Sequence, residues 1–435
     1  MQKVDILVKG GWIITNGEKG QFVGDIAIKE GKILEVGESL FEKYSADKVI
    51  EANNKIVAPS FANMHTHAAM NLFRGIGADL SLMDWLTKVI WPLEGEFVSP
   101  EFVRDGVELA ILEMIKSGTT FYLDMYFFEE HTAEIVKKAG IRAGLGFGIL
   151  DFPTKVAQTP DEYLKRARDF VEQFRNDNDV IPVVAPHATY TCSPDTLTKA
   201  MELAEEFDVP YHIHLAESQG ELAQVKEKYG TTPVRHMQNL GLLKPRVIAA
   251  HMVWLDEEER EAVAESGVKV AHCPESNLKL GSGIAPVSDY VKKGITVCLG
   301  TDGAASNDNL NMLEEASTMV KLQKGINLDP TALNSIQALK IATSNGFESV
   351  GIKAGKIEEG YDADLIVINT EKPELQPLYD PTAQLIYSAQ AADIETVIAR
   401  GRIIMENGKV LTLDEEEIYE KANRWKRKIL EKLKS

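Results

Sequence analysis

The 435-residue sequence predicts an α/β protein in which a (β/α)₈ barrel is joined to a small β-sandwich domain built from both chain ends. Between residues 59 and 350, apolar strand candidates alternate with helical stretches, and this alternation is typical of a parallel sheet. Eight strand candidates occur, which is the number that closes such a barrel. Histidines and carboxylates lie at most of the strand ends, and a barrel gathers these ends around one axis, where its active site lies.

The two ends of the chain share a sequence pattern that differs from that of the barrel. Alternating apolar residues closed by glycine turns occur at 5–11, 24–33, 362–368 and 397–404. Neither end makes a full core alone. We therefore expect residues 1–58 and 351–435 to form one small β-sandwich domain, and residues 59–350 to form the barrel.

A helix is expected at about 414–434, as the last element of the terminal domain. Apolar residues recur along one side of this segment, at Ile418, Ala422, Trp425 and Ile429. The helix should pack on the body of the protein through this stripe.

Within the barrel, many of the strand candidates end at residues that carry chemistry. These ends lie near His67, Met125, Ile149, His187, Glu217, His251, Cys273 and Asp302. Helical patterns lie between the strands, for example at 102–116 and 196–207. In an open sheet these side chains would not converge, whereas in a barrel they meet at one mouth.

The composition limits the partners of the protein. Asp+Glu 66 against Lys+Arg 47 gives a net charge of −19, which disfavours nucleic acid and anionic membranes as partners. Three cysteines without a CxxC pair are typical of reduced thiols, and neither a secretory signal nor a membrane-length apolar run is found. We expect a soluble, cytoplasmic protein that acts on a small molecule, and the sequence leaves open whether it forms a homo-oligomer.

The segment 61–67 contains two histidines separated by one residue. On an extended segment His65 and His67 point to the same face, and two neighbouring imidazoles make half of a divalent metal site. His214 and Asp302, near the ends of two other strands, complete a set of donors with room for a water. We expect one divalent ion here, and zinc suits the donors best, although Fe²⁺ or Mn²⁺ would fit them too.

His212 competes with His214 because the two residues share a strand face. The site of a barrel lies at the C-terminal strand ends, which favours His214 as the ligand and places His212 lower in the barrel. His272 has no assigned role, unless it supports the site through hydrogen bonds to other residues.

The motifs of this chain resemble those of the amidohydrolase superfamily, with HxH on the first strand, histidines on the fifth and sixth, and aspartate on the eighth. The chain is most similar to the 5′-methylthioadenosine/S-adenosylhomocysteine deaminase family, and the resemblance covers nearly all of it. Six segments carry it, at 63–67, 72–75, 84–86, 124–126, 272–283 and 299–307. The two long motifs, at 272–283 and 299–307, are shared by a broader deaminase and chlorohydrolase branch.

Three residues are expected to carry the chemistry. Asp302 is the expected fourth ligand and can also accept a proton from the attacking water. His251 is expected to hydrogen-bond the attacking oxygen and to stabilise the charge that develops there. Glu217, three residues after His214, is expected to protonate the purine ring nitrogen next to C6 and then to pass protons to the leaving ammonia.

The resemblance also implies substrate contacts. Glu94 matches the family glutamate that binds the ribose hydroxyls, and His187 matches the fourth-strand histidine that contacts the nucleoside. Trp85 is our first choice for the wall of an apolar pocket that holds a purine or a thioether. Where family members that bind the homocysteine carboxylate carry an arginine, this chain has Phe147, which favours an uncharged 5′ substituent.

The sequence therefore predicts a metal-dependent aminohydrolase that converts an adenine nucleoside to the inosine analogue and ammonia. Candidate substrates are 5′-methylthioadenosine, adenosine, 5′-deoxyadenosine and S-adenosylhomocysteine. An alternative within the same branch is a deaminase or hydrolase of guanine, a pterin, cytosine or a chlorotriazine. A remote alternative is an inactive barrel that only binds a partner, but such barrels have typically lost the metal ligands that this chain retains.

Overall fold

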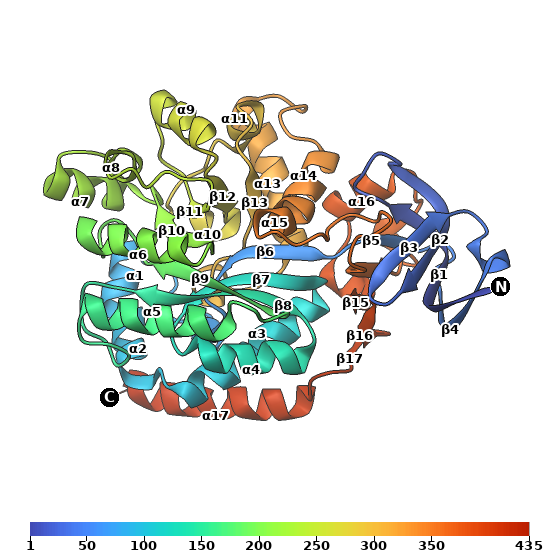
Figure 1. Ribbon diagram of the computed structural model, residues 1–435, viewed down its shortest axis with the longest axis horizontal. Helices are drawn as coiled ribbons and strands as arrows, with labels where there is room; N and C mark the ends of the chain where they lie inside the picture. The colour runs from blue at the N-terminus through green and yellow to red at the C-terminus, as the bar shows by residue number, and fades with distance from the viewer. Residues whose placement is uncertain (435) are drawn as a thin grey trace.

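The computed structural model describes residues 1–434 and contains two β-sheets (Figure 1). The larger domain is built on eight parallel strands that pair in chain order. They are β6 (Phe61–Thr66), β7 (Thr119–Tyr126), β8 (Arg142–Ile149), β9 (Val180–Pro186), β10 (Tyr211–Leu215), β11 (Val247–His251), β12 (Lys269–His272) and β13 (Val297–Leu299). The predicted fold class is confirmed, because these strands form a nearly closed barrel.

The last strand meets the first just beyond β13, and this seam brings distant residues into the site. The backbone N–H of Asp302 donates to the carbonyl of His65 at 2.9 Å, and that of Thr301 donates to the side-chain oxygen of Asn63 at 3.0 Å. Gly300 permits this close approach, because an added Cβ would lie 2.8 Å from the backbone nitrogen of His65. The seam therefore places Asp302 beside the first-strand histidines.

Helices surround the barrel on its outer side (Figure 1). The segment after β6 contains η2 (Ala68–Phe73), α1 (Leu82–Trp85), the π-helix η3 (Leu86–Ile90) and α2 (Trp91–Phe97). The others are α3 (Pro100–Lys116), α4 (Glu129–Ala139), α5 (Pro160–Phe174), α6 (Pro194–Glu206), α7 (Gln219–Tyr229), α8 (Pro233–Asn239), α9 (Glu257–Ser266), α10 (Pro274–Lys279), α11 (Val287–Lys292), α12 (Ala304–Asn307), α13 (Met312–Asn327), α14 (Ser335–Ala342) and α15 (Ser344–Ser349).

Several of these helices begin with the same local signal. A serine or threonine caps the first turn and a proline follows at the first helical position, as in Ser99–Pro100, Thr159–Pro160 and Ser193–Pro194. The side-chain oxygen accepts an N–H that the helix leaves unpaired, and proline has no N–H to lose at that position. These caps make the helix starts readable from the sequence.

The two ends of the chain join in a second sheet of nine strands. They are β1 (Gln2–Ile14), β2 (Gln21–Lys29), β3 (Lys32–Gly37), β4 (Tyr44–Glu51), β5 (Ile56–Pro59), β14 (Leu365–Ile368), β15 (Ile394–Ala399), β16 (Arg402–Glu406) and β17 (Lys409–Val410). β5 pairs antiparallel with β14, which links the N-terminal strands to the C-terminal ones. The short elements η1 (Leu40–Glu42), η4 (Pro373–Leu375), α16 (Pro381–Tyr387) and η5 (Ala391–Asp393) connect these strands.

The final helix, α17 (Glu415–Lys434), lies along the barrel rather than on the second sheet (Figure 1). Its buried residues are Ile418, Trp425 and Ile429, which belong to the predicted stripe. The indole N–H of Trp425 donates to Asp105 of α3 at 2.8 Å, and its ring lies edge-on to Phe102 at 5.1 Å. Within residues 1–434, no helix is both long and apolar enough to cross a membrane.

Candidate metal centre and active site

The mouth of the barrel holds a cavity of about 390 Å³ at the C-terminal ends of the strands. Its floor is made by His67, His214, His251, Glu217 and Asp302, from four different strand ends. Its walls are mostly apolar and come from α1, η3, α2 and the segment after β8. A mostly apolar cavity with a few converging polar groups is typical of a small-molecule site.

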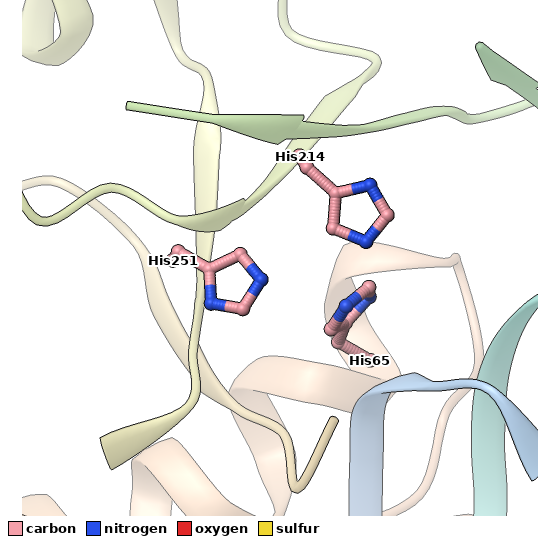
Figure 2. Close-up of side chains that lie close together, drawn as sticks. All are labelled: His65, His214 and His251. Carbon is pink, nitrogen blue, oxygen red and sulfur yellow. The ribbon is translucent and has the colours of Figure 1, made fainter. Parts of the chain in front are cut away.

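The predicted metal donors lie together on the floor of this cavity. The Nε2 atoms of His65 and His67 lie 3.5 Å and 3.3 Å from Oδ1 of Asp302, and Nε2 of His67 lies 3.2 Å from Nε2 of His214. Figure 2 shows the rings of His214 and His251, from neighbouring strands, directed at His65. Two overlapping clusters result, His65–His67–Asp302 and His65–His214–His251, each with donor atoms within 4.8 Å of one another.

The other ring nitrogen of each expected ligand is already occupied. Nδ1 of His65 lies 2.8 Å from Nε2 of His212, Nδ1 of His67 lies 2.7 Å from the carbonyl of Met125, and Nδ1 of His214 lies 2.7 Å from the carbonyl of His187. These contacts orient the rings and leave each Nε2 directed toward the cluster.

The donor set therefore fits a divalent ion. Among the described residues, Nε2 of His65 is fully buried without a hydrogen-bond partner, which is costly unless something binds it. Three imidazole nitrogens and one carboxylate are ligands that zinc and similar ions accept.

The positions of His212 and His214 agree with the sequence argument. His212 is buried beneath the site, between His65 and the carbonyl of Ile248, which lies 2.8 Å from Nδ1. Burial lowers its pKa to about 3, so the ring is neutral at pH 7. His212 thus contacts a candidate ligand, whereas His214 faces the cavity itself.

Two hydrogen-bond donors hold the carboxylate of Asp302. The hydroxyl of Ser276 donates to Oδ2 at 2.6 Å, and the N–H of Gly303 donates to Oδ1 at 2.8 Å. Burial alone would raise the pKa of Asp302, but His65 and the other histidines hold it well below its usual range. The carboxylate is therefore anionic, as a metal ligand must be.

Asp124, on β7, holds the segment that carries the two first-strand histidines. Its Oδ1 accepts the hydroxyl of Thr66 at 2.8 Å and the backbone N–H of Ala68 at 2.9 Å. Sequence reasoning gave this residue no role. Its place in the 124–126 motif could have indicated a role in the sequence. Asp124 directly precedes Met125, whose backbone carbonyl orients His67.

Glu217 and His251 face each other across the cavity floor, with Oε2 and Nε2 3.8 Å apart. Asn277 contacts Nδ1 of His251 at 2.9 Å, and the Ser282 hydroxyl donates to Glu217 at 3.4 Å. Burial raises the pKa of Glu217, which favours its proton-carrying form. Burial by itself would lower the pKa of His251, but Glu217 and Asp302 raise it above its ordinary value.

Glu94, on α2, enters the cavity from the side. The phenol of Tyr126 donates to its Oε1 at 2.8 Å, and burial raises its pKa to about 7. His187 also lines the cavity, with its Nδ1 2.9 Å from the hydroxyl of Thr191. Trp85, at the end of α1, is buried and forms part of the apolar wall. With Glu217, four of the five predicted substrate contacts therefore line the same cavity.

Phe147 is the exception, and the prediction that it faces the 5′ end of the substrate is corrected. Successive residues of a strand point to opposite faces. On β8 the odd-numbered residues, Phe147 included, are buried among the surrounding helices, whereas Gly148 lines the cavity. Arg142 lies at the other end of β8, where it pairs with Asp362 and Asp364.

The remaining histidines lie outside the cavity. His272 is buried on β12 and, within the described part of the chain, neither ring nitrogen has a hydrogen-bond partner. His131 and His236 lie on α4 and α8.

Comparison with known proteins identifies relatives over the whole chain. The family model "Amidohydrolase family" matches residues 56–404. The 5-methylthioadenosine/S-adenosylhomocysteine deaminase of Aquifex aeolicus is 59% identical over 435 residues, 100% of each chain. The 5′-deoxyadenosine deaminase of Methanosarcina acetivorans is 42% identical over 96% of each chain. The crystal structure of an adenosine deaminase from Xanthomonas campestris with bound zinc superposes with a TM-score of 0.96, at 35% identity, covering 98% of this chain and 99% of that one.

Proposed function

The chain belongs to the amidohydrolase family, and from this membership we propose that the cavity at the barrel mouth deaminates an adenine nucleoside to the inosine analogue and ammonia. The predicted enzyme class, a metal-dependent aminohydrolase, is confirmed. The observation that carries the proposal is the cavity itself, which joins the metal-donor cluster and Glu217 to a half-buried carboxylate, Glu94, suited to ribose hydroxyls.

The protein uses a divalent metal, and we propose that it is zinc held by His65, His67, His214 and Asp302. Bound there, the ion lowers the pKa of a water so that it becomes a nucleophile near neutral pH. Zinc in the Xanthomonas adenosine deaminase supports this choice over iron or manganese.

Three side chains of the floor divide the proton chemistry. Asp302 takes a proton from the attacking water through the carboxylate that Ser276 and Gly303 hold in place. His251, oriented by Asn277, donates a hydrogen bond to the attacking oxygen and stabilises its charge. Glu217 gives its proton to the ring nitrogen next to C6, takes up the second proton of the attacking water from the C6 hydroxyl, and passes that proton to the amine, which leaves as ammonia. The first proton of the water, held by Asp302, then restores Glu217.

The walls of the cavity orient the nucleoside. Glu94 accepts hydrogen bonds from the two ribose hydroxyls, with Tyr126 fixing one of its oxygens. His187 contacts the nucleoside beside the metal cluster, since its ring centroid lies 4.7 Å from that of His214. Trp85 packs against the apolar part of the substrate and excludes water.

A substrate panel scored by ammonia release tests this function. Adenosine and 5′-methylthioadenosine are expected to have much higher kcat/KM than free adenine or guanine, because a carboxylate that a bound ligand covers without supplying hydroxyl partners costs about 1–3 kcal/mol. Glu94→Ala should narrow the gap between nucleosides and free bases. If guanine or a pyrimidine base is the best substrate in the panel, the nucleoside assignment is wrong, although deaminase chemistry survives.

Phe147 faces away from the cavity, so other residues must contact the 5′ end of the substrate. We expect this end to contact the segment after β8, which lines the cavity. Phe152, Pro153 and Val156 give this part of the cavity an apolar lining, which suits a methylthio group. Lys155 is the one lysine or arginine among the described residues that line the cavity. Its Nζ lies 2.5 Å from the backbone carbonyl of Glu96, a neutral partner. We propose that Lys155 meets the carboxylate of a longer, charged 5′ tail.

Lys155→Met is expected to lower kcat/KM for S-adenosylhomocysteine by about twofold to fivefold, the range of an exposed ion pair. Turnover of 5′-methylthioadenosine should not change, because its 5′ group carries no charge. Steady-state assays at two salt concentrations measure kcat/KM for both substrates. Added salt should reduce the difference between wild type and Lys155→Met for S-adenosylhomocysteine. Lys165→Met, on the outer face of α5, is the matched control. Equal losses for both substrates would exclude the ion pair.

A further inference from the structure

The turn that presents Glu217 to the cavity has an unusual backbone. It follows β10 and precedes α7, and Ala216 has a φ of 53°, in the left-handed region. A residue with a Cβ rarely adopts this conformation, so the surroundings must hold it. Glu217 comes directly after this residue, and the direction of its side chain depends on how firmly the turn is held.

Glu221, near the start of α7, hydrogen-bonds the backbone of the turn at Ala216 and Glu217. Its Oε2 accepts the backbone N–H of Glu217 at 2.7 Å, and its Oε1 accepts that of Ala216 at 3.2 Å. The hydroxyl of Thr189 donates to Oε1 at 3.2 Å. Both carboxylate oxygens therefore accept hydrogen bonds from the turn, at Ala216 and Glu217, and one of them also accepts a hydrogen bond from Thr189, which follows the neighbouring strand β9.

Glu221 is 2% exposed and does not line the cavity, so it does not touch the substrate. A buried carboxylate is costly, and burial raises the pKa of Glu221 to about 7, a shift that the negative charge of Glu217 increases and the three donors oppose. A residue needed only to begin a helix would not have to be buried in this way, since Ser218 already caps α7.

We propose that Glu221 is a positioning residue, which holds the strained Ala216–Glu217 turn so that the Glu217 carboxyl stays within reach of the purine ring. This proposal rests on the proton-transfer role of Glu217 in the proposed function. It assigns no chemistry to Glu221 itself. Its effect must therefore appear in turnover and must disappear when Glu217 can no longer transfer a proton.

The first test is Glu221→Gln, which keeps the size of the side chain but replaces one acceptor by an NH₂ group facing a backbone N–H. We expect kcat for adenosine to fall by about 10- to 100-fold, as for loss of a well-placed buried hydrogen bond. KM should change by less than about threefold, because the substrate contacts are made elsewhere. Metal content should not change.

The deciding test is a double-mutant cycle with Glu217→Gln, measured at high enzyme concentration. In the Glu217→Gln background, Glu221→Gln should lower kcat by less than about twofold, because the side chain that it positions no longer transfers a proton. If Glu221→Gln has its full effect in that background, Glu221 does not act through Glu217 and the proposal is overturned. If Glu217→Gln alone turns over at the normal rate, the proposed function of Glu217 fails instead.

A matched control exists on the next helix but one. Glu259 is buried in the first turn of α9, where it accepts the N–H of Asp256 at 2.8 Å and a hydroxyl from Thr232. Glu259→Gln should lower the melting temperature as much as Glu221→Gln but leave kcat unchanged. Equal kcat losses in both variants would show that general destabilisation explains the effect. If Glu221→Gln does not fold, Glu221→Asp, which keeps the charge but not the reach, replaces it in the same cycle.

Discussion

His214→Ala is expected to abolish both the bound divalent ion and the deaminase activity. His214 supplies one of three imidazole nitrogens to the cluster, and its Nε2 lies 3.2 Å from that of His67. The alanine leaves a gap on the cavity floor and removes one imidazole donor from the cluster. Residues that hydrogen-bond metal ligands typically contribute about 10–100-fold in metal affinity or activity. Loss of a ligand itself should therefore have a larger effect than that. Elemental analysis of protein purified without added metal, together with ammonia release, measures both losses.

His212→Ala is the matched control for this experiment. His212 lies on the same strand face but contacts Nδ1 of His65 at 2.8 Å rather than the cluster. This variant should still bind about one equivalent of metal when metal is supplied, with affinity lowered by about 10–100-fold. The reverse result, metal lost with His212→Ala and kept with His214→Ala, would show that the ligands are assigned to the wrong member of the pair.

Glu217→Gln is expected to lower kcat by about 10²–10⁴-fold, the contribution typical of a general acid–base group. Glutamine matches the shape of glutamate, but its amide is not acidic and cannot transfer a proton to the ring nitrogen. The metal content should stay unchanged, since Glu217 contacts His251 and Ser282 rather than the expected metal ligands. Single-turnover kinetics with adenosine separate the chemical step from product release.

Glu94→Gln is the control variant for Glu217→Gln, because it changes a substrate contact and not the proton transfer. Glu94 lies on the cavity wall, so its loss should raise KM for nucleosides far more than it lowers kcat. Near-normal turnover in Glu217→Gln would remove Glu217 from the mechanism and leave it as a polar residue at the start of α7.

Alternation and strand ends explain why much of the candidate site could be predicted. His65 and His67 are separated by one residue on an extended segment, which puts them on one face in any strand. His214 could be preferred to His212 because barrel sites lie at the C-terminal ends. Both assignments depend only on the geometry of one strand and the direction of the sheet.

Phe147 shows where such reasoning fails. A matched motif places a residue along a strand, but an error of one position turns the side chain to the opposite face. Gly148, which has no side chain to signal a role, is the residue at the cavity. The supporting residues Asp124, Ser276 and Glu221 were also missed, because each acts on a group whose partner can be identified only after folding.

Patterns within short stretches of the sequence were enough to predict the barrel, the family and the residues that converge at the barrel mouth. These follow from local pattern, since periodicity, caps and short motifs act within a few residues. Packing in the folded chain decides which face of β8 lines the cavity, how the β13–β6 seam sets Asp302 beside His65, and which buried side chains hold the reacting groups. Those features depend on contacts between residues far apart in the chain, and such contacts exist only once the strands have closed on one another.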